Sequence, residues 1–260
     1  MTASSVLVTG GTGTLGRDVV RQLREAGHRA RVFSRQAGSG DDWTQGDLAT
    51  GEGLERALAG MDAVIHAASD PRLAWRTQAT DVGGTRKLLE AASRAGIGHL
   101  VYVSIVGIDG LASRYYRAKV AAEQIVRKDI VPWSILRATQ FHTLMDSWIA
   151  RYSRMPFVAA IPFGWQFQPV DTRDVAAKLV ALVTGKPGGM LPDFGGPEIR
   201  RFRSLAISSL EARRMKKPIV SVPIPFGISR QIAQGRLLSP DHKEGTITFE
   251  QYLVRKYGQW

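Results

Sequence analysis

The hydrophobic and polar positions near the N-terminus predict a strand, a loop and a helix in succession. Residues 6–8 form a short, apolar, β-branched run before a group of glycines, as expected of a buried strand. After the glycines, Val19, Val20 and Leu23 recur at helical spacing, and Gly27 stands where a glycine commonly ends a helix. The chain therefore begins with a strand–loop–helix unit.

The same alternation continues to about residue 140. Short apolar segments predict further strands, and the stretches between them have the periodicity of helices. Strands are predicted at 30–33, 43–45, 62–66, 100–104 and 133–137, and helices at 54–58, at about 78–95 and around 115–123. Strands that alternate with helices form a parallel, doubly wound sheet. We therefore expect an α/β fold of the Rossmann-like type with six parallel strands.

The regular alternation fails beyond residue 140. Residues 141–168 are rich in aromatic side chains, so they are expected either to wall a substrate pocket or to form a packed subdomain. A further helix is predicted to begin within residues 170–175, with Asp171 or Thr172 as its N-cap.

Length and composition limit the class of protein. The 260 residues suit one large α/β domain, and a hydrophobic content of 44% supplies a sizeable core. We predict a dinucleotide-binding core over residues 1–140, with substrate-side segments and a small C-terminal lobe over 141–260 packed on the same domain. The sequence has no apolar run of 18 residues, no basic leader with an apolar core and no cysteine. We therefore expect a cytoplasmic protein with no membrane partner, no disulfide and no metal site.

The formal net charge of +12 suggests a negatively charged ligand. Such a charge suits either nucleic acid or an anionic cofactor such as a dinucleotide phosphate. The basic residues are spread along the chain, with local clusters at 200–203 and 213–217, and neither cluster lies in a nucleic-acid-binding motif. A solvated basic face is the favoured interpretation of these clusters, so no nucleic-acid partner is expected.

The glycine loop has a spacing suited to a dinucleotide. Gly10, Gly13 and Gly16 follow a Gly-x-x-Gly-x-x-Gly pattern between the first strand and the first helix. Gly10 would permit the tight turn, Gly13 would let the backbone approach a pyrophosphate, and Gly16 would let the helix pack closely on the strand. An ordinary glycine-rich turn is the alternative, but the strand–loop–helix context favours a dinucleotide site.

The end of the second predicted strand indicates which dinucleotide is bound. This strand ends at Ser34 and Arg35, where a dinucleotide fold meets the adenosine ribose. An acidic residue there would bind the 2′-hydroxyl, whereas an arginine accommodates a 2′-phosphate through forked, charge-assisted hydrogen bonds. NADP(H) is therefore the predicted cofactor. A plain surface arginine is the alternative.

Two later strands deliver small or polar residues to the same edge of the predicted sheet. His66 is followed by Ala67 and Ala68, which would leave room for a ligand at the edge where parallel sheets bind ligands. We interpret His66 as a packed, hydrogen-bonded histidine and not as a catalytic base. Ser104 ends the next strand and would reach the same edge.

Ser104, Tyr115 and Lys119 are the candidate catalytic residues. Tyr115 and Lys119 are four residues apart and therefore share one helix face. A lysine ammonium and an oxidised nicotinamide would lower the tyrosine pKa from its usual value near ~10. Tyr115 could then give a proton to a carbonyl oxygen as hydride arrives, or remove it in reverse, while Ser104 holds the same oxygen. Tyr116 is an adjacent alternative.

Together these motifs resemble the short-chain dehydrogenase/reductase superfamily, and within it the atypical, extended NmrA-like NAD(P)-binding branch. The resemblance covers roughly residues 5–140. It rests on the glycine loop Thr9–Gly16, Arg35, Gly46–Leu48, His66–Ser69, Ser104 and the pair Tyr115 and Lys119.

The resemblance implies a role for each matching residue. The loop residues would cradle the pyrophosphate, Arg35 would hold the 2′-phosphate, and Lys119 would bind the nicotinamide ribose. The segment 137–140 would pass near the nicotinamide. The loop residues implied are Thr12, Gly13, Thr14 and Leu15, the adenine contacts are Asp47 and Leu48, and the residues lining the cofactor are Ala67 and Ala68.

Two departures from the family pattern keep two functions open. Asp81 stands where extended members have an asparagine that supports the active-site water and lysine, and Ala138-Thr139 replaces a Pro-Gly pair. The first hypothesis is an NADP(H)-dependent oxidoreductase acting on the carbonyl, alcohol or enone of a small, fairly apolar molecule. The alternative is a non-catalytic NAD(P)-binding redox sensor that acts through a protein partner.

Overall fold

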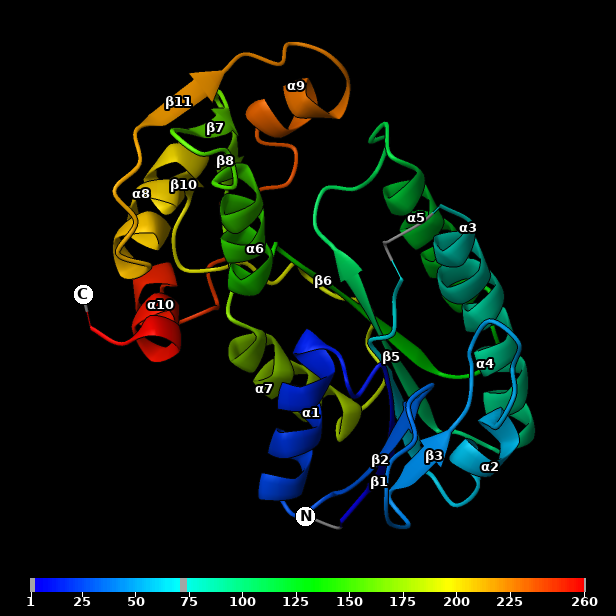
Figure 1. The fold of residues 1–260 in the computed structure, drawn as a ribbon. Helices are drawn as coiled ribbons and strands as arrows, with labels where there is room; N and C mark the ends of the chain where they lie inside the picture. The colour runs from blue at the N-terminus through cyan, green and yellow to red at the C-terminus, as the bar shows by residue number, and fades with distance from the viewer. Residues whose placement is uncertain (1–2, 71–73, 260) are drawn as a thin grey trace. The chain divides into compact units, whose positions relative to one another are not determined.

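The computed structural model describes residues 3–70 and 74–259, which form two compact units (Figure 1). The first unit comprises the chain up to Ser104 together with Ser113–Arg137 and Val175–Pro192. The second comprises Ile105–Ala112, Ala138–Asp174 and the chain from Asp193 onward. The chain thus passes between the units several times.

The first unit is built on a seven-stranded sheet in the order β3-β2-β1-β4-β5-β6-β9. The chain enters at the interior strand β1, adds β2 and β3 toward one edge, and then returns to add the other strands on the opposite side of β1, which confirms the doubly wound parallel fold. The strands are β1 (Ser5–Thr9), β2 (Arg29–Ser34), β3 (Trp43–Gln45), β4 (Ala63–His66), β5 (His99–Ile105), β6 (Trp133–Ala138) and β9 (Gly189–Met190).

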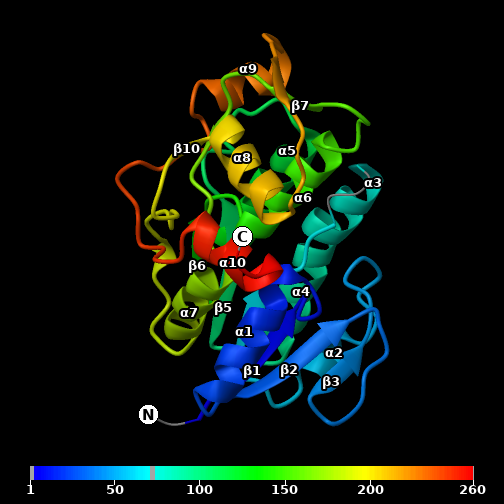
Figure 2. The same ribbon diagram turned by 60° about the vertical axis from the view of Figure 1, so that its left-hand side comes forward.

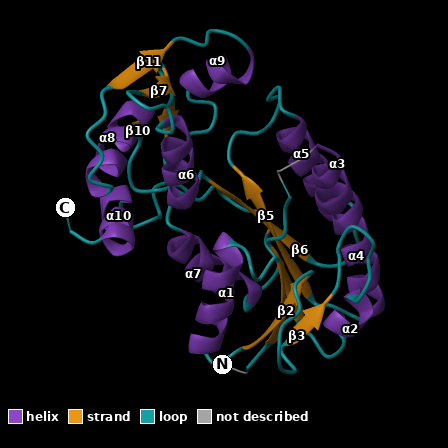
Figure 3. Cartoon of the chain, viewed as in Figure 1, coloured by secondary structure: helices purple, strands orange, loops and turns teal. Residues whose placement is uncertain are grey.

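Helices cover both faces of this sheet. Figure 3 shows α1 and α7 on one face and α2, α4 and α5 on the other. Val6, Leu7 and Val8 of β1 are fully buried, as the apolar run predicts for a central parallel strand. The helices are α1 (Thr14–Glu25), α2 (Leu54–Leu58), α3 (Ala74–Thr77), the π-helix η1 (Gln78–Gly83), α4 (Gly84–Arg94), α5 (Arg114–Arg127) and α7 (Thr172–Val183).

Two features of this unit correct the sequence prediction. The sheet has a seventh strand, β9, whose two residues are too few to produce an alternating pattern. The single helix predicted over 78–95 consists of η1 followed by α4. The change of helix type falls at Gly83 and Gly84, adjacent residues of low helix propensity.

The second unit combines helices with two small two-stranded sheets. β7 pairs with β11 in parallel, and β8 pairs with β10 in antiparallel fashion. Figure 2 shows α8 and α10 beside each other in this unit. Its elements are α6 (His142–Tyr152), β7 (Ala159–Pro162), β8 (Gln166–Phe167), β10 (Arg200–Arg201), α8 (Phe202–Ala212), β11 (Ile219–Val222), α9 (Gly227–Ala233) and α10 (Phe249–Tyr257).

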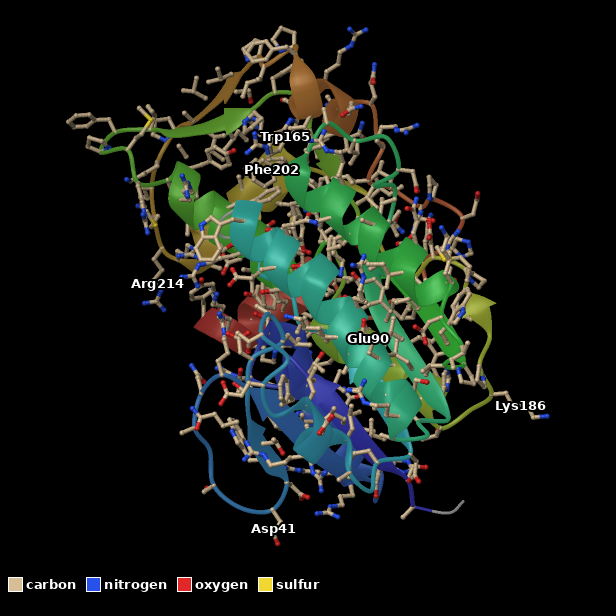
Figure 4. The ribbon with its side chains drawn as sticks, turned by 90° about the vertical axis from the view of Figure 1, so that its right-hand side faces the viewer. Asp41, Glu90, Trp165, Lys186, Phe202 and Arg214 are labelled. Atoms are coloured by element: carbon tan, nitrogen blue, oxygen red, sulfur yellow. The ribbon has the colours of Figure 1, made fainter. Side chains whose placement is uncertain are left out.

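Several of the aromatic residues predicted either to wall a pocket or to pack form a cluster inside the second unit. Trp165 lies with its ring centroid 5.8 Å from those of Phe167 and Phe202, and Trp148 lies 5.8 Å from Phe167. Figure 4 labels Trp165 and Phe202, whose side chains lie close together. By contrast, Phe157 is 83% exposed.

A buried carboxylate ties three helices of the second unit together. Asp146 of α6 accepts hydrogen bonds from Ser209 and Arg213 of α8, at 2.7 and 2.8 Å, and from Lys256 of α10 at 2.6 Å. Burial alone would raise the pKa of Asp146, but these donors outweigh it and lower the pKa. The cluster at 213–217 therefore includes a structural arginine as well as exposed basic residues.

The N-cap prediction for α7 is confirmed. The Asp171 carboxylate accepts a hydrogen bond from the backbone N–H of Arg173 at 3.0 Å, as an N-cap residue does. Among the described residues, no helix is long and apolar enough to cross a membrane.

Candidate cofactor and active site

The glycine loop forms a tight turn against the neighbouring strand end. Gly10 has a φ of +70°, and a Cβ placed on it would lie 2.7 Å from the Cα of Ala68. A Cβ on Gly16 would lie 2.1 Å from the carbonyl oxygen of Gly10, so α1 packs directly on the loop. The N–H of Gly13 closes the turn by bonding to that carbonyl at 2.8 Å. Both close approaches require glycine.

The start of α1 is suited to an anion. Gly13 is the N-cap residue and has no side chain with which to satisfy the first helical N–H groups. Its first turn also contains no acidic residue. Unsatisfied N–H groups and the positive end of the helix dipole favour a phosphate at this position.

A pocket of about 220 Å³ lies beside this turn, within the first unit. It gathers most of the residues predicted to bind the cofactor, from the ends of several parallel strands and the loops after them. These are Gly10, Thr12, Gly13, Ser34, Arg35, Asp47, Leu48, Ala67 and Ala68. Thr14, Leu15, Gly16 and Lys119 do not line it.

The pocket also contains residues that the sequence analysis did not assign. Phe33, Gly46, Ser69, Asp70 and Thr80 line it as well. Gly46 lies in the motif Gly46–Leu48 and Ser69 in the motif His66–Ser69, so the sequence contained a signal for these two and none for the other three. Only the tertiary structure brings these five residues together around one pocket.

Arg35 lies at the pocket with its side chain 52% exposed. Its guanidinium is 3.7 Å from the carboxylate of Asp70, whose side chain is buried. The hydroxyls of Thr12 and Ser34 lie 3.3 Å apart nearby. An arginine with an exposed face beside two hydroxyls can receive a 2′-phosphate.

His66 is a structural residue, as predicted. It is fully buried and contacts Thr9 Oγ1 through Nδ1 at 2.7 Å and Thr85 Oγ1 through Nε2 at 2.9 Å. Thr85 Oγ1 donates to the carbonyl of Asp81, so its lone pair accepts from Nε2–H, and Nδ1 accepts from Thr9. Burial lowers the pKa of His66 to about 3, which keeps the ring neutral.

Ser104 is the penultimate residue of β5 and has a buried hydroxyl. Its Oγ has no hydrogen-bond partner among the described residues. Buried hydroxyls are nearly always paired in proteins, so an orphan one at a strand end is available to a ligand oxygen. This observation fits the substrate-orienting role predicted for Ser104.

Lys119 is buried, and its position is fixed by the sheet. Its Nζ donates to the carbonyl oxygen of Val103 at 2.8 Å, lies 4.0 Å from the Asp81 carboxylate and sits 4.2 Å above the Tyr102 ring. Burial lowers the pKa of Lys119, and Asp81 and Glu123 oppose that effect.

Tyr115 lies beside the dinucleotide pocket, where its hydroxyl accepts a hydrogen bond from Ser69 Oγ at 3.3 Å. Burial raises the pKa of Tyr115 to about 12, the Ser69 contact opposes this, and Asp81 adds to it. Without a bound cofactor the pKa of Tyr115 is therefore raised, whereas the sequence predicted that Lys119 and an oxidised nicotinamide would lower it. Tyr116 is buried next to it, with ring centroids 5.5 Å apart.

The strand-end segment 137–140 makes contacts of its own. Arg137 forms a two-pronged ion pair with Glu123, at 2.8 and 2.7 Å, so its guanidinium holds α5 to the end of β6. Gln140 is buried, and neither of its amide atoms has a partner among the described residues.

These features fit a dinucleotide. The pocket has a glycine cradle that a Cβ would fill, a helix N-terminus open to an anion, and an arginine at one end. No group of three His, Cys, Asp or Glu side chains within 3–70 and 74–259 is arranged to hold a metal ion.

Comparison with known sequences also indicates a protein that binds NAD(P)H. A family described as NAD(P)H-binding matches residues 10–184. The chain is 31% identical over 230 residues to a (4-alkanoyl-5-oxo-2,5-dihydrofuran-3-yl)methyl phosphate reductase of Streptomyces griseus, covering 85% of this chain and 76% of the relative. It is 29% identical over 190 residues to a ceramide reductase of Caulobacter vibrioides, covering 68% of this chain and 60% of that relative.

Solved structures share the fold. A short-chain dehydrogenase/reductase superfamily protein of Agrobacterium tumefaciens with bound NAD has a TM-score of 0.75 at 22% identity, covering 98% of this chain and 96% of the other. UDP-glucose 4-epimerase of Thermus thermophilus, in complex with NAD, has a TM-score of 0.73 at 19% identity, covering 96% and 99%. The chain belongs to the NAD(P)H-binding family, its relatives named here are reductases, and it shares the fold of a short-chain dehydrogenase/reductase superfamily protein.

Proposed function

We propose that this protein is an NADP(H)-dependent reductase acting on the carbonyl or enone of a small, fairly apolar molecule, or in reverse on an alcohol. One observation carries the proposal. Ser69 lines the dinucleotide pocket, and its hydroxyl lies 3.3 Å from that of Tyr115. This contact supports a proton donor at the end of the cofactor site.

Three side chains would do the chemistry beside the cofactor. A bound nicotinamide supplies or accepts a hydride. Tyr115 would give its phenolic proton to the substrate oxygen, and the unpartnered hydroxyl of Ser104 would hold that same oxygen. Lys119, fixed by the Val103 carbonyl, would bind the ribose.

The choice of NADP(H) over NAD(H) is also part of the proposal. It is supported by Arg35 at the end of β2, which has no acidic neighbour in that strand. Each charge-assisted hydrogen bond to a 2′-phosphate contributes about 1.5–3 kcal/mol, which corresponds to roughly tenfold to a hundredfold in affinity.

The substrate class follows from the chemistry of the relatives and of the site. The Streptomyces relative is named as a reductase of a (4-alkanoyl-5-oxo-2,5-dihydrofuran-3-yl)methyl phosphate, and the Caulobacter relative as a ceramide reductase. The alkanoyl group of the first name and the ceramide of the second support reduction of a molecule with an apolar part, and the first substrate also carries a phosphate. The proposal includes a small-molecule partner and a cytoplasmic location, the latter resting on the sequence alone.

The experiment is an assay of NADPH oxidation against a panel of aldehydes, ketones, quinones and enones. We expect turnover with at least one class, and a fall of about 10²–10⁴-fold in Tyr115→Phe with NADPH affinity retained. Tyr116→Phe is the matched control and should be mild. A protein that binds NADPH yet is inert across the panel would favour the redox-sensor alternative, which none of the relatives named above supports.

A further inference from the structure

The small sheet formed by β7 and β11 in the second unit has one buried face and one exposed face. The two strands lie side by side (Figure 1), and Ile161 on the inner face is buried. On the outer face Val220 and Val222 are exposed. The parallel register pairs these valines with Ala160 and Pro162. A strand with one face in water normally alternates apolar and polar residues, whereas here the outer face is apolar on both strands.

Four further apolar side chains project from the segments that enter and leave this sheet. Three are phenylalanines that are 83%, 65% and 73% exposed, and the fourth is a half-exposed methionine. They are Phe157, Phe163, Phe226 and Met155. The N–H of Phe163 donates to the carbonyl oxygen of Val222 at 2.9 Å, so this ring belongs to the edge of the sheet. We call these four residues, together with Val220 and Val222, the β7–β11 surface.

The two stretches that contain the β7–β11 surface, 147–170 and 212–240, include no Asp or Glu. Their basic residues stand close to the surface in the chain: before Met155, before β11 and in or just after α9. They are Arg151, Arg154, Arg213, Arg214, Lys216, Lys217, Arg230 and Arg236. Glu211 and Asp109 border these stretches, so basic residues are in clear excess.

Several of these charges have no acidic partner. Lys217 Nζ donates to the carbonyl oxygen of Met155 at 2.8 Å, which holds its ammonium beside the apolar surface. Arg154, Lys216 and Arg230 are exposed, and none of them forms an ion pair within the part of the chain that the structure describes. The surface therefore combines projecting apolar side chains with uncompensated positive charge.

We propose that the β7–β11 surface docks peripherally on an anionic lipid bilayer, with its phenylalanine rings in the interface and its basic residues at the headgroups. Apolar side chains beside Lys and Arg bind membranes through buried apolar area and through attraction to anionic lipid. This inference departs from the expectation of no membrane partner, which considered only segments that could span a membrane. It does not depend on the proposed function.

A second copy of the chain and a protein partner fit this surface less well. In a symmetric dimer the same basic residues would face one another, and like charges repel. Protein interfaces are depleted of lysine relative to the rest of the surface, whereas Lys216 and Lys217 come just before β11. Contiguous exposed apolar side chains nonetheless mark an interaction site.

The first test is co-sedimentation of the full chain with vesicles of phosphatidylcholine, with or without phosphatidylglycerol. We expect binding to the anionic vesicles at low ionic strength that weakens as salt is added. Phe157→Ser should weaken this binding by about tenfold, and Lys216→Gln by about fivefold. The matched controls Ile130→Ser, at a position 84% exposed, and Lys128→Gln, also exposed, lie in the first unit and should bind as the unmodified protein does.

The absence of cysteine from the sequence permits a second test. Phe157→Cys, labelled with a polarity-sensitive fluorophore, should shift its emission to shorter wavelength when anionic vesicles are added, because the label enters the interface. Ile130→Cys with the same label should not respond. Both side chains are exposed, so thermal denaturation should show that neither substitution changes the stability of the fold.

Three results would overturn the inference. The first is no binding of the unmodified protein to anionic vesicles, or binding that Phe157→Ser and Ile130→Ser weaken equally. The second is retention by an acidic polypeptide such as polyglutamate but not by vesicles, which would indicate an acidic protein partner. The third is a dimer in sedimentation velocity that Phe157→Ser dissociates, which would assign the surface to a second copy. None of these experiments measures NADPH oxidation, so failure of the proposed function is separate from failure of this inference.

Discussion

The Arg35 guanidinium lies 3.7 Å from the Asp70 carboxylate, and both side chains line the same pocket. Arg35 is half-exposed whereas Asp70 is buried. In the free protein the arginine is therefore held toward the pocket by a carboxylate that a 2′-phosphate would have to displace as a partner. Under the proposed assignment of Arg35, we expect the two residues to have opposite effects on NADPH affinity.

Substitution of Arg35 tests the choice of cofactor. We expect Arg35→Ala to lose about tenfold to a hundredfold in NADPH affinity, since charge-assisted bonds of about 1.5–3 kcal/mol are lost. NADH affinity should change little, because NADH has no 2′-phosphate. Fluorescence titration of both cofactors measures the difference. Equal affinity of the unmodified protein for NADPH and NADH would contradict the assignment of Arg35.

Asp70→Asn is predicted to act in the opposite direction. It removes the negative charge near the phosphate while keeping the side-chain shape. A partly exposed ion pair contributes at most about 1 kcal/mol, so NADPH should bind up to about fivefold more tightly. The same titration shows the effect, and weaker NADPH binding in Asp70→Asn would mean that its carboxylate supports the cofactor.

Gly16→Ala should disrupt the glycine loop. The added Cβ would lie 2.1 Å from the Gly10 carbonyl oxygen, so backbone must move. We expect a loss of about 1–3 kcal/mol in the free energy of unfolding, as for other overpacked sites, together with little stabilisation by added NADPH. Gly98→Ala is the control, because its nearest atom would be 3.6 Å away. Thermal denaturation with and without NADPH distinguishes them.

His66 should make the protein less stable in acid. Its pKa of about 3 in the folded protein lies below the usual histidine pKa of 6.5, so below about pH 6.5 the unfolded chain binds a proton that the folded protein excludes. Stability is therefore intact above pH 6.5 and falls toward pH 3. From pH 7.5 to 5.5 this one group should cost about 1.4 kcal/mol.

Urea denaturation of the unmodified protein and of His66→Gln at both pH values isolates this contribution. The substitution should lower stability at pH 7.5 but reduce the further loss on acidification by about 1.4 kcal/mol. His99 and His142, whose pKa values burial also lowers, are present in both proteins and cancel. Identical acid sensitivity in the two proteins would show that His66 does not titrate as described.

Removal of the buried Asp146 carboxylate should destabilise the second unit. Asp146→Ala leaves Arg213 and Lys256 without their buried partner. Breaking a buried pair typically costs about 3–5 kcal/mol, and the partial exposure of Lys256 places the expected loss near about 3. Glu25→Ala, which breaks the exposed pair with Arg21, should cost less than about 1 kcal/mol. Chemical denaturation measures both.

Local sequence determined the framework of the first unit. A buried parallel strand must be a continuous apolar run, as at residues 6–8, and a close turn against a neighbouring strand must be glycine, as at Gly10 and Gly16. These requirements act on adjacent residues, so the pattern alone predicts them. The packed role of His66 followed for the same reason, from its place at the end of an apolar strand.

Tertiary structure decided the features that join distant parts of the chain. β9 is too short to be recognised without its partner β6, and the aromatic residues of the second unit could be assigned to a packed cluster only from their ring contacts. The connection from Asp81 through Ser69 to Tyr115 spans η1, the loop after β4 and α5. No spacing rule relates such residues, because hydrogen-bond geometry between separate elements depends on how they pack.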